Sequence, residues 1–108
     1  MLAGATVPGE VQGDPAFLAI LDEIRAMHLK KSADYGTAAD TFANFIASEQ
    51  CGIDPAHGVW VRTLDKVQRI NKYWRDKRLA NESLEDSLLD LASYAMIQLA
   101  LLRRKKPT

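Results

Sequence analysis

The sequence contains only one cysteine, Cys51, so no disulfide bond can form within the chain. A chain without disulfides is typical of a reducing compartment, and we expect the protein to be cytoplasmic. The sequence also lacks an excess of charge, because 14 lysine and arginine residues balance 14 aspartate and glutamate residues. Without a basic field over the whole chain, nucleic acid is not an expected partner.

Long apolar runs and nucleotide-binding glycine motifs are missing as well. The most apolar stretch, residues 88–102, is interrupted by Asp90, Ser93 and Gln98, so it predicts a buried helix and no membrane association. The first residues lack the basic-then-apolar layout of a signal peptide. Neither GxxxxGK(S/T) nor GxGxxG occurs, which excludes a P-loop site and a Rossmann site.

The sequence is rich in helical periodicity. No segment shows the strict alternation of a strand, so we predict an all-α fold, a four-helix bundle with short connections. Aspartate followed by proline at residues 14–15 and 54–55 marks two helix starts, and Asn81 is a candidate cap for the last helix. The expected helices cover residues 14–32, 42–51, 54–78 and 81–104. We expect a single helical domain at 14–104, a flexible N-terminal arm at 1–13 and a C-terminal tail at 105–108.

Three acidic residues, Glu82, Asp86 and Asp90, recur every fourth position in the last predicted helix. At about 100° per residue they form one stripe, and like charges at this spacing destabilise a helix by a few tenths of a kcal/mol per pair. A hard divalent cation held by carboxylate oxygens would offset that repulsion. The alternative is the helix dipole, which favours acidic residues in the first turns.

The predicted helix over 54–78 has an apolar face and a charged face. We expect the apolar face to lie on the core side, and it contains Trp60, Leu64, Val67 and Trp74. The opposite face contains Arg62, Asp65, Lys66, Arg69 and Tyr73. This face is either solvated or packed against the acidic stripe. In the second case Asp65 would complete a carboxylate cluster, and the lysine and arginine residues would bind phosphate oxygens.

The last predicted helix is apolar on every side in its C-terminal half. The side that carries the acids continues with Met96, Ile97, Ala100 and Leu101, opposite Leu99 and Leu102. A helix that is apolar all round is buried all round, so the carboxylates should lie at the mouth of a second packed layer. In so small a protein we expect that layer to be another subunit, in a homodimer or homotetramer.

Four segments together resemble a known family. They are Lys31-Ser-Ala-Asp34-Tyr35-Gly36, Phe42-Ala-Asn44-Phe45, Arg62-Thr-Leu-Asp65-Lys66-Val-Gln-Arg69 and Glu82-Ser-Leu-Glu-Asp86-Ser-Leu-Leu-Asp90-Leu-Ala-Ser-Tyr94. Over residues 18–102 the chain resembles the nucleotide modification associated domain 1 family, which is widespread in phages and bacteria. That family looks like a branch of the all-α NTP pyrophosphohydrolases, which include the MazG-like enzymes.

The resemblance implies a hydrolase that converts a nucleoside triphosphate to the monophosphate and pyrophosphate with Mg²⁺, or with Mn²⁺ in its place. The implied metal ligands are Asp65, Glu82, Asp86 and Asp90, of which the first three would also be catalytic. The residues implied to contact the nucleotide are Lys31, Asp34, Tyr35, Asn44, Arg62, Lys66 and Arg69. Within that set, Tyr35 would stack on the base and Asn44 would bond its edge.

The sequence departs from the MazG-like metal motifs. Arg62 and Asp65 stand where those enzymes have Glu-x-x-Glu, and Ser83 rather than glutamate precedes Asp86 by three residues. The residues around Asp34 are equally consistent with an ordinary helix-ending turn. Two interpretations therefore remain open: an active pyrophosphohydrolase, and a non-catalytic helical module that binds a nucleotide or a partner protein.

Overall fold

The computed structural model describes residues 12–35, 42–80 and 82–105, with no side-chain description for Tyr35 and Lys105. The elements in chain order are α1 (Pro15–Tyr35), α2 (Ala43–Ile46), η1 (Ala47–Cys51), α3 (Pro55–Asp76) and α4 (Leu84–Lys105). No strand occurs in these ranges, so the prediction of an all-α fold is confirmed. Residues 1–11, which hold most of the predicted arm, residues 106–108 of the predicted tail, and Asn81 lie outside the described residues.

Local capping interactions account for where the helices begin and end. The Phe17 amide donates to Oδ2 of Asp14 at 2.8 Å, which is the predicted cap of α1. The short segment formed by α2 and η1 ends at Gly52, whose φ of 75° is the left-handed conformation that glycine adopts without strain. The structure therefore confirms these predicted boundaries.

The start of α4 differs from the prediction. The Asp86 amide donates to Oγ of Ser83 at 3.0 Å, so Ser83 caps a helix that begins at Leu84. Glu82 consequently precedes α4 and is not part of the helical stripe with Asp86 and Asp90. The i, i+4, i+8 arrangement expected for these three acids was wrong for this reason.

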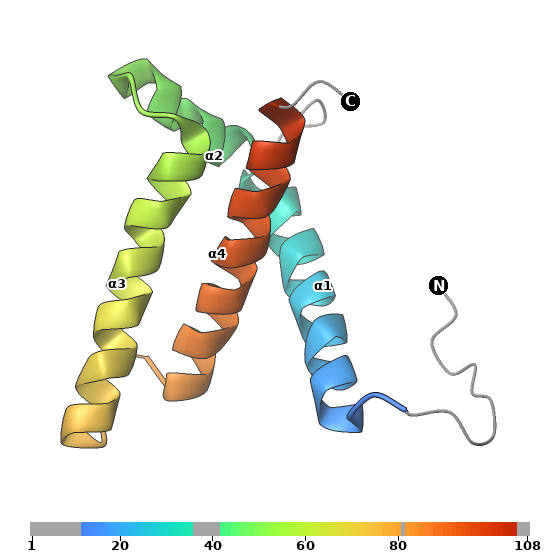
Figure 1. The fold of residues 1–108 in the computed structure, drawn as a ribbon, viewed down its shortest axis with the longest axis vertical. Helices are drawn as coiled ribbons and strands as arrows, with labels where there is room; N and C mark the ends of the chain where they lie inside the picture. The colour runs from blue at the N-terminus through green and yellow to red at the C-terminus, as the bar shows by residue number, and fades with distance from the viewer. Residues whose placement is uncertain (1–11, 36–41, 81, 106–108) are drawn as a thin grey trace.

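The helices are arranged as an antiparallel hairpin with a third long helix leaning against it (Figure 1). α3 and α4 run side by side along most of their length, and α2 with η1 lies across one end of this hairpin. The C-terminal half of α1 approaches α4, whereas its N-terminal half stands apart from the hairpin. Since α1 does not close over the hairpin, the four-helix bundle stays a prediction.

The described helices include none with the length and hydropathy of a membrane span.

The core of the described chain is small and lies near the α2 end of the hairpin. Ala56 and Val59 of α3 pack with Leu101 of α4, and aromatic and aliphatic side chains of α2 and α4 surround them. Thr63 continues the same buried face of α3 and donates its hydroxyl hydrogen to the Val59 carbonyl oxygen at 2.9 Å. Small residues on this face let α3 approach α4 closely.

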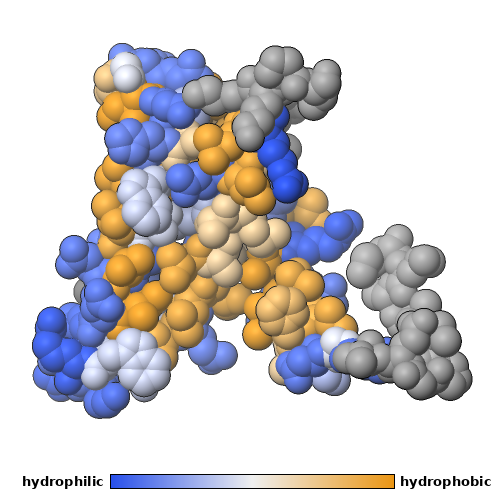
Figure 2. Space-filling model, viewed as in Figure 1, coloured by the Kyte–Doolittle hydropathy of each residue, from blue (hydrophilic) through white to orange (hydrophobic). Residues whose placement is uncertain are grey.

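Three of the four residues predicted on the core side of α3 are exposed, and the fourth, Val67, is half-buried. Trp60, Leu64 and Trp74 point away from the hairpin interface because Ala56, Val59 and Thr63 occupy it. Figure 2 shows apolar side chains gathered along the hairpin and on α1. The exposed large hydrophobic residues are Phe17, Leu18, Ile20, Leu21, Leu29, Ile53, Trp60, Val61, Leu64, Trp74, Leu88, Met96, Leu99 and Leu102. So much apolar surface is unusual for a soluble monomer.

Candidate functional site

A half-buried lysine contacts two of the predicted acidic residues. Nζ of Lys66, in the middle of α3, lies 3.0 Å from Oε1 of Glu82 and 2.9 Å from Oδ2 of Asp90. The Lys66 side chain is 12% exposed, and each carboxylate side chain is 18% exposed. Glu82 comes from the segment before α4 and Asp90 from its second turn. The two acids therefore converge on one ammonium group between the hairpin helices.

The other oxygen of each carboxylate also has a donor. Oε2 of Glu82 accepts a hydrogen bond from Oγ of Ser87, which is fully buried. Oδ1 of Asp90 lies 3.5 Å from Nζ of Lys31, which reaches it from α1. All four carboxylate oxygens are thus in contact with a described donor, and the cluster ties α1, α3 and α4 together.

The surroundings of Lys66 and Glu82 favour their charged forms. Burial lowers the pKa of Lys66, but the hydrogen bonds to Asp90 and Glu82 and their charges together outweigh it and raise that pKa above its ordinary value. The Ser87 hydrogen bond is the largest influence on Glu82; with Lys66 and Arg69 it lowers the Glu82 pKa against the opposing effect of burial. At neutral pH Lys66 and Glu82 are therefore charged and paired.

The other two predicted metal ligands lie outside this cluster. The Asp65 side chain is 62% exposed, and its Oδ2 lies 3.1 Å from Nε of Arg69 in the same helix. Asp86 is exposed on the first turn of α4. In the described ranges, no three His, Cys, Asp or Glu side chains come close enough to hold one metal ion. The structure brings Glu82 and Asp90 together, and metal binding by the four predicted residues stays a prediction.

A pocket of about 460 Å³ opens beside the cluster, between α1, α2, α3 and α4. Lys31, Asn44 and Arg62, which come from three of these helices, are predicted nucleotide contacts that line it. The remaining lining residues are His28, Ser32, Phe42, Phe45, Ser93, Tyr94 and Ile97. Lys31 both lines the pocket and contacts Asp90, so the pocket and the ion cluster adjoin.

Aromatic side chains that contact one another form part of the pocket wall. The ring centroids of His28 and Phe42 are 5.7 Å apart, and those of Phe42 and Phe45 are 6.3 Å apart. Cζ of Arg62 lies 5.0 Å from the centroid of the Phe45 ring. This contact is a cation–π interaction, and it favours a position of the guanidinium group at the pocket.

The remaining predicted contacts are placed elsewhere. Lys66 and Arg69 are engaged in ion pairs and do not line the pocket. Asp34 is exposed in the last turn of α1, and the side chain of Tyr35 lies outside the described residues. The sequence interpretation missed His28 and Tyr94 as pocket residues. Helical spacing was the available signal, because His28 precedes Lys31 by three positions and Tyr94 follows Asp90 by four.

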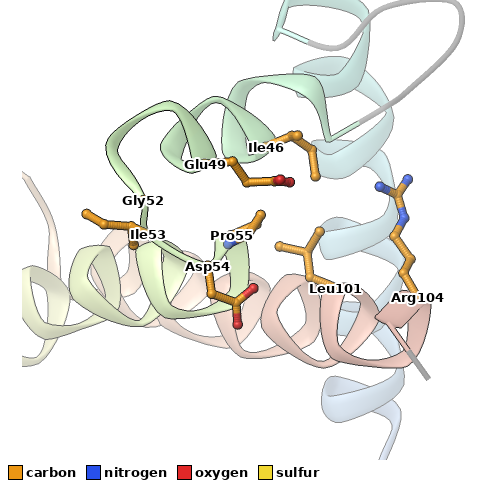
Figure 3. A pocket seen from close by; sticks show the side chains of 8 residues that line it. All are labelled: Ile46, Glu49, Gly52, Ile53, Asp54, Pro55, Leu101 and Arg104. Atoms are coloured by element: carbon orange, nitrogen blue, oxygen red, sulfur yellow. The ribbon is translucent and has the colours of Figure 1, made fainter.

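A second and larger cavity, of about 580 Å³, lies between η1, the start of α3 and the end of α4. Figure 3 shows Ile46, Glu49 and Leu101 turned into this space. Its charged lining residues are Glu49, Asp54 and Arg104, and none of the predicted site residues lines it. With two carboxylates and one guanidinium, it is less suited to a phosphate than the smaller pocket.

Comparison with protein-family models, curated proteins and solved structures finds no match for this chain. The resemblance to the nucleotide modification associated domain 1 family therefore stays a prediction. The case for any function depends on the pocket and on the ion cluster beside it.

Proposed function

We propose that the chain binds a nucleotide in the pocket between α1, α2, α3 and α4. The observation that carries the proposal is the composition of the pocket wall: Lys31 and Arg62 supply positive charge, and no described aspartate or glutamate lines it. Asp90, which pairs with Lys31 at 3.5 Å, lies outside the lining. Phosphate oxygens are the natural partners of these two groups, and arginine can bind them in bidentate fashion.

The same pocket also offers surface for a base. Phe42, Phe45 and Tyr94 supply aromatic surface, and stacking on an aromatic side chain is worth about 1–3 kcal/mol per base. The amide of Asn44 offers both a donor and an acceptor to a base edge. A volume of about 460 Å³ lies within the range of small-molecule sites. Groups suited to phosphate and groups suited to a base, within one pocket of this size, support a single nucleotide as the ligand.

Calorimetric titration with common and base-modified nucleoside triphosphates tests this proposal. Arg62→Gln should weaken binding by at least about tenfold, since hydrogen bonds to charged groups contribute roughly 1.5–3 kcal/mol. Arg75→Gln is the matched control, because Arg75 is exposed near the end of α3 and pairs with Asp76 away from the pocket. Equal affinities for the two variants, or no binding by the unmodified chain, would overturn the proposal.

A second candidate function is the hydrolysis of a nucleoside triphosphate to monophosphate and pyrophosphate with Mg²⁺ or Mn²⁺. The observation that favours it is the convergence of Glu82 and Asp90 on one point beside the pocket. The site as folded does not fit a bound ion, because the Lys66 ammonium occupies that point and every carboxylate oxygen has a donor. Metal-dependent turnover that Asp90→Asn abolishes would favour the enzyme over the binding module.

The working form of the protein is a homo-oligomer under this proposal. Only four hydrophobic residues in the described ranges are buried, Ile24, Ala56, Val59 and Leu101, whereas large apolar side chains are exposed on α1, α3 and α4. A second copy packed against these faces would bury the exposed apolar side chains, which the small core of one chain leaves in contact with water. Sedimentation at micromolar concentration should show a dimer or a tetramer, and a monomer would contradict this part of the proposal.

The place of action stays a prediction. Cys51 is exposed and forms no disulfide, which is compatible with a reducing, cytoplasmic environment.

A further inference from the structure

The ion cluster beside the pocket has no net formal charge. It consists of two ammonium groups, Lys66 and Lys31, and two carboxylates, Glu82 and Asp90, so its formal charges cancel. The hydroxyl of Ser87 occupies the one carboxylate oxygen that neither lysine contacts. A site of this kind has no excess negative charge with which to attract a dication.

We infer that Lys66 is the resident cation of this site, held where a divalent ion would otherwise bind, and that Glu82 and Asp90 become a metal site only when its ammonium group is removed. The inference does not depend on nucleotide binding. It assigns the cluster a different chemistry from the four-carboxylate magnesium centre expected from the sequence.

The geometry favours the ammonium over a free ion. Nζ of Lys66 lies about equally far from the two acids, at 3.0 Å from Oε1 of Glu82 and 2.9 Å from Oδ2 of Asp90. Because Lys66 is part of the chain, it reaches the site without the entropic loss of a free ion. A magnesium ion would also have to lose bound water molecules. It would then need near-ideal octahedral geometry, with its ligand oxygens at roughly 2.0–2.1 Å.

Electrostatic repulsion would act in the same direction. A dication that entered with both lysines in place would meet the half-exposed ammonium group of Lys31 and the largely shielded ammonium group of Lys66. Repulsion between like charges is stronger in a partly shielded site than in bulk solvent. Magnesium or manganese can therefore occupy the site only in place of Lys66. The chain offers few other ligands there, since Asp65 is paired with Arg69 and Asp86 faces solvent.

The decisive variant is Lys66→Ser, which removes the ammonium and leaves room for an ion with its waters. We expect saturable Mn²⁺ binding by calorimetry in this variant, together with a rise in melting temperature on adding Mn²⁺. The unmodified chain should show neither effect. Lys72→Ser is the matched control, because Lys72 lies on the same helix and pairs with Asp76 at the surface; it should bind no Mn²⁺.

The double variant Lys66→Ser with Asp90→Asn tests whether Mn²⁺ binding gained by Lys66→Ser depends on the Asp90 carboxylate. It should lose the Mn²⁺ binding that Lys66→Ser gains. If Lys66→Ser is unfolded without metal, recovery of its helical circular dichroism on adding Mn²⁺ supports the inference. A folded Lys66→Ser variant that binds no Mn²⁺ would overturn it.

A measurement on the unmodified chain does not depend on how the variants fold. Millimolar Mn²⁺ should leave the amide NMR signals of Ser87 and Asp90 as sharp as those of residues far from the cluster. Selective paramagnetic broadening of these two signals would show that the ion enters despite Lys66, and the inference would be wrong. Nucleotide is absent from all of these experiments, so their outcome is separate from that of the proposed function.

Discussion

The Nζ atom of Lys66 lies 2.9 Å from Oδ2 of Asp90, and this contact joins the middle of α3 to the second turn of α4. Both side chains are largely shielded from water. Each therefore depends on the other, because a charge that loses its partner in such a place keeps its desolvation cost. The same lysine holds Glu82, so one ammonium group organises the hairpin and the edge of the adjoining pocket.

Lys66→Met should be strongly destabilising. It removes the charge that two shielded carboxylates share, and the loss should be about 3 kcal/mol in the free energy of unfolding, at the lower end for a buried pair because the site is partly exposed. Urea denaturation measures it. Lys72→Met, which breaks only the exposed pair with Asp76, should change the free energy of unfolding little. Similar losses in the two variants would show that the Lys66 contacts are not special.

Glu82 should make stability depend on pH in the acid range. Folding lowers the pKa of Glu82 below its ordinary value of 4.5, so the carboxylate stabilises the fold above the unfolded-state pKa. That stability is lost as the pH falls through the lower, folded-state pKa. Glu82→Gln should therefore flatten the acid side of the stability curve obtained by urea unfolding. A variant curve parallel to that of the unmodified chain would contradict the assigned environment of Glu82.

The opposite sign applies to Lys66 on the alkaline side. Its pKa is raised by folding, so its contribution is present below the ordinary value of 10.5 and is lost as the pH rises through the higher folded-state pKa. Urea unfolding at alkaline pH should show this loss in the unmodified chain and not in Lys66→Met.

Ser83→Ala should weaken the start of α4. The substitution removes the oxygen that accepts the Asp86 amide hydrogen, and loss of such a cap costs about 1 kcal/mol. Ser83→Asp should retain most of the stability, since aspartate is an equally good cap. Thermal melts of the two variants give the comparison. If alanine and aspartate are equivalent at this position, the helix does not depend on the Ser83 cap.

Asp90→Asn should separate the two candidate functions. If the protein is a binding module, the substitution removes an anion that competes with phosphate for Lys31, and nucleotide affinity should rise by roughly two- to fivefold, in line with the strength of exposed ion pairs. If the protein is a metal-dependent hydrolase, the same change should abolish turnover. Weaker binding by this variant in the absence of metal would contradict the role assigned to Lys31.

Much of the helical structure followed from local signals in the sequence. Asp14 caps α1 as expected, Pro55 begins α3, and Gly52 takes the left-handed conformation that ends η1. Each depends on a few neighbouring residues and can be predicted from them. The sequence predicted Asn81 as the cap of α4, whereas Ser83 caps it. Asparagine and serine are about equally good caps, so local preference does not choose between these two positions. Glu82 lies before the helix and contacts Lys66 and Ser87 from there.

The orientation of α3 was decided by packing that periodicity does not encode. Its sequence has two faces able to turn inward, one with Trp60 and Leu64 and another with Ala56, Val59 and Thr63. The smaller residues allow closer approach to α4, so they form the interface and the larger ones are left exposed.

The candidate site could be predicted in part. Lys31, Asn44 and Arg62 were proposed as nucleotide contacts and meet in one pocket, although they belong to three different helices. The sequence also grouped Glu82, Asp90 and Lys66. It did not show that the lysine lies between the acids, because that depends on the distance between α3 and α4.

Nucleotide titration followed by amide NMR tests the central claim most directly. A nucleoside triphosphate added without metal should shift the signals of residues in and next to the pocket, above all Lys31, Asn44, Arg62 and Ser93, in a saturable way. Signals near the exposed end of α3, around Arg75, should not move. Shifts confined to other parts of the chain, or no shifts at all, would contradict the claim that this pocket binds a nucleotide.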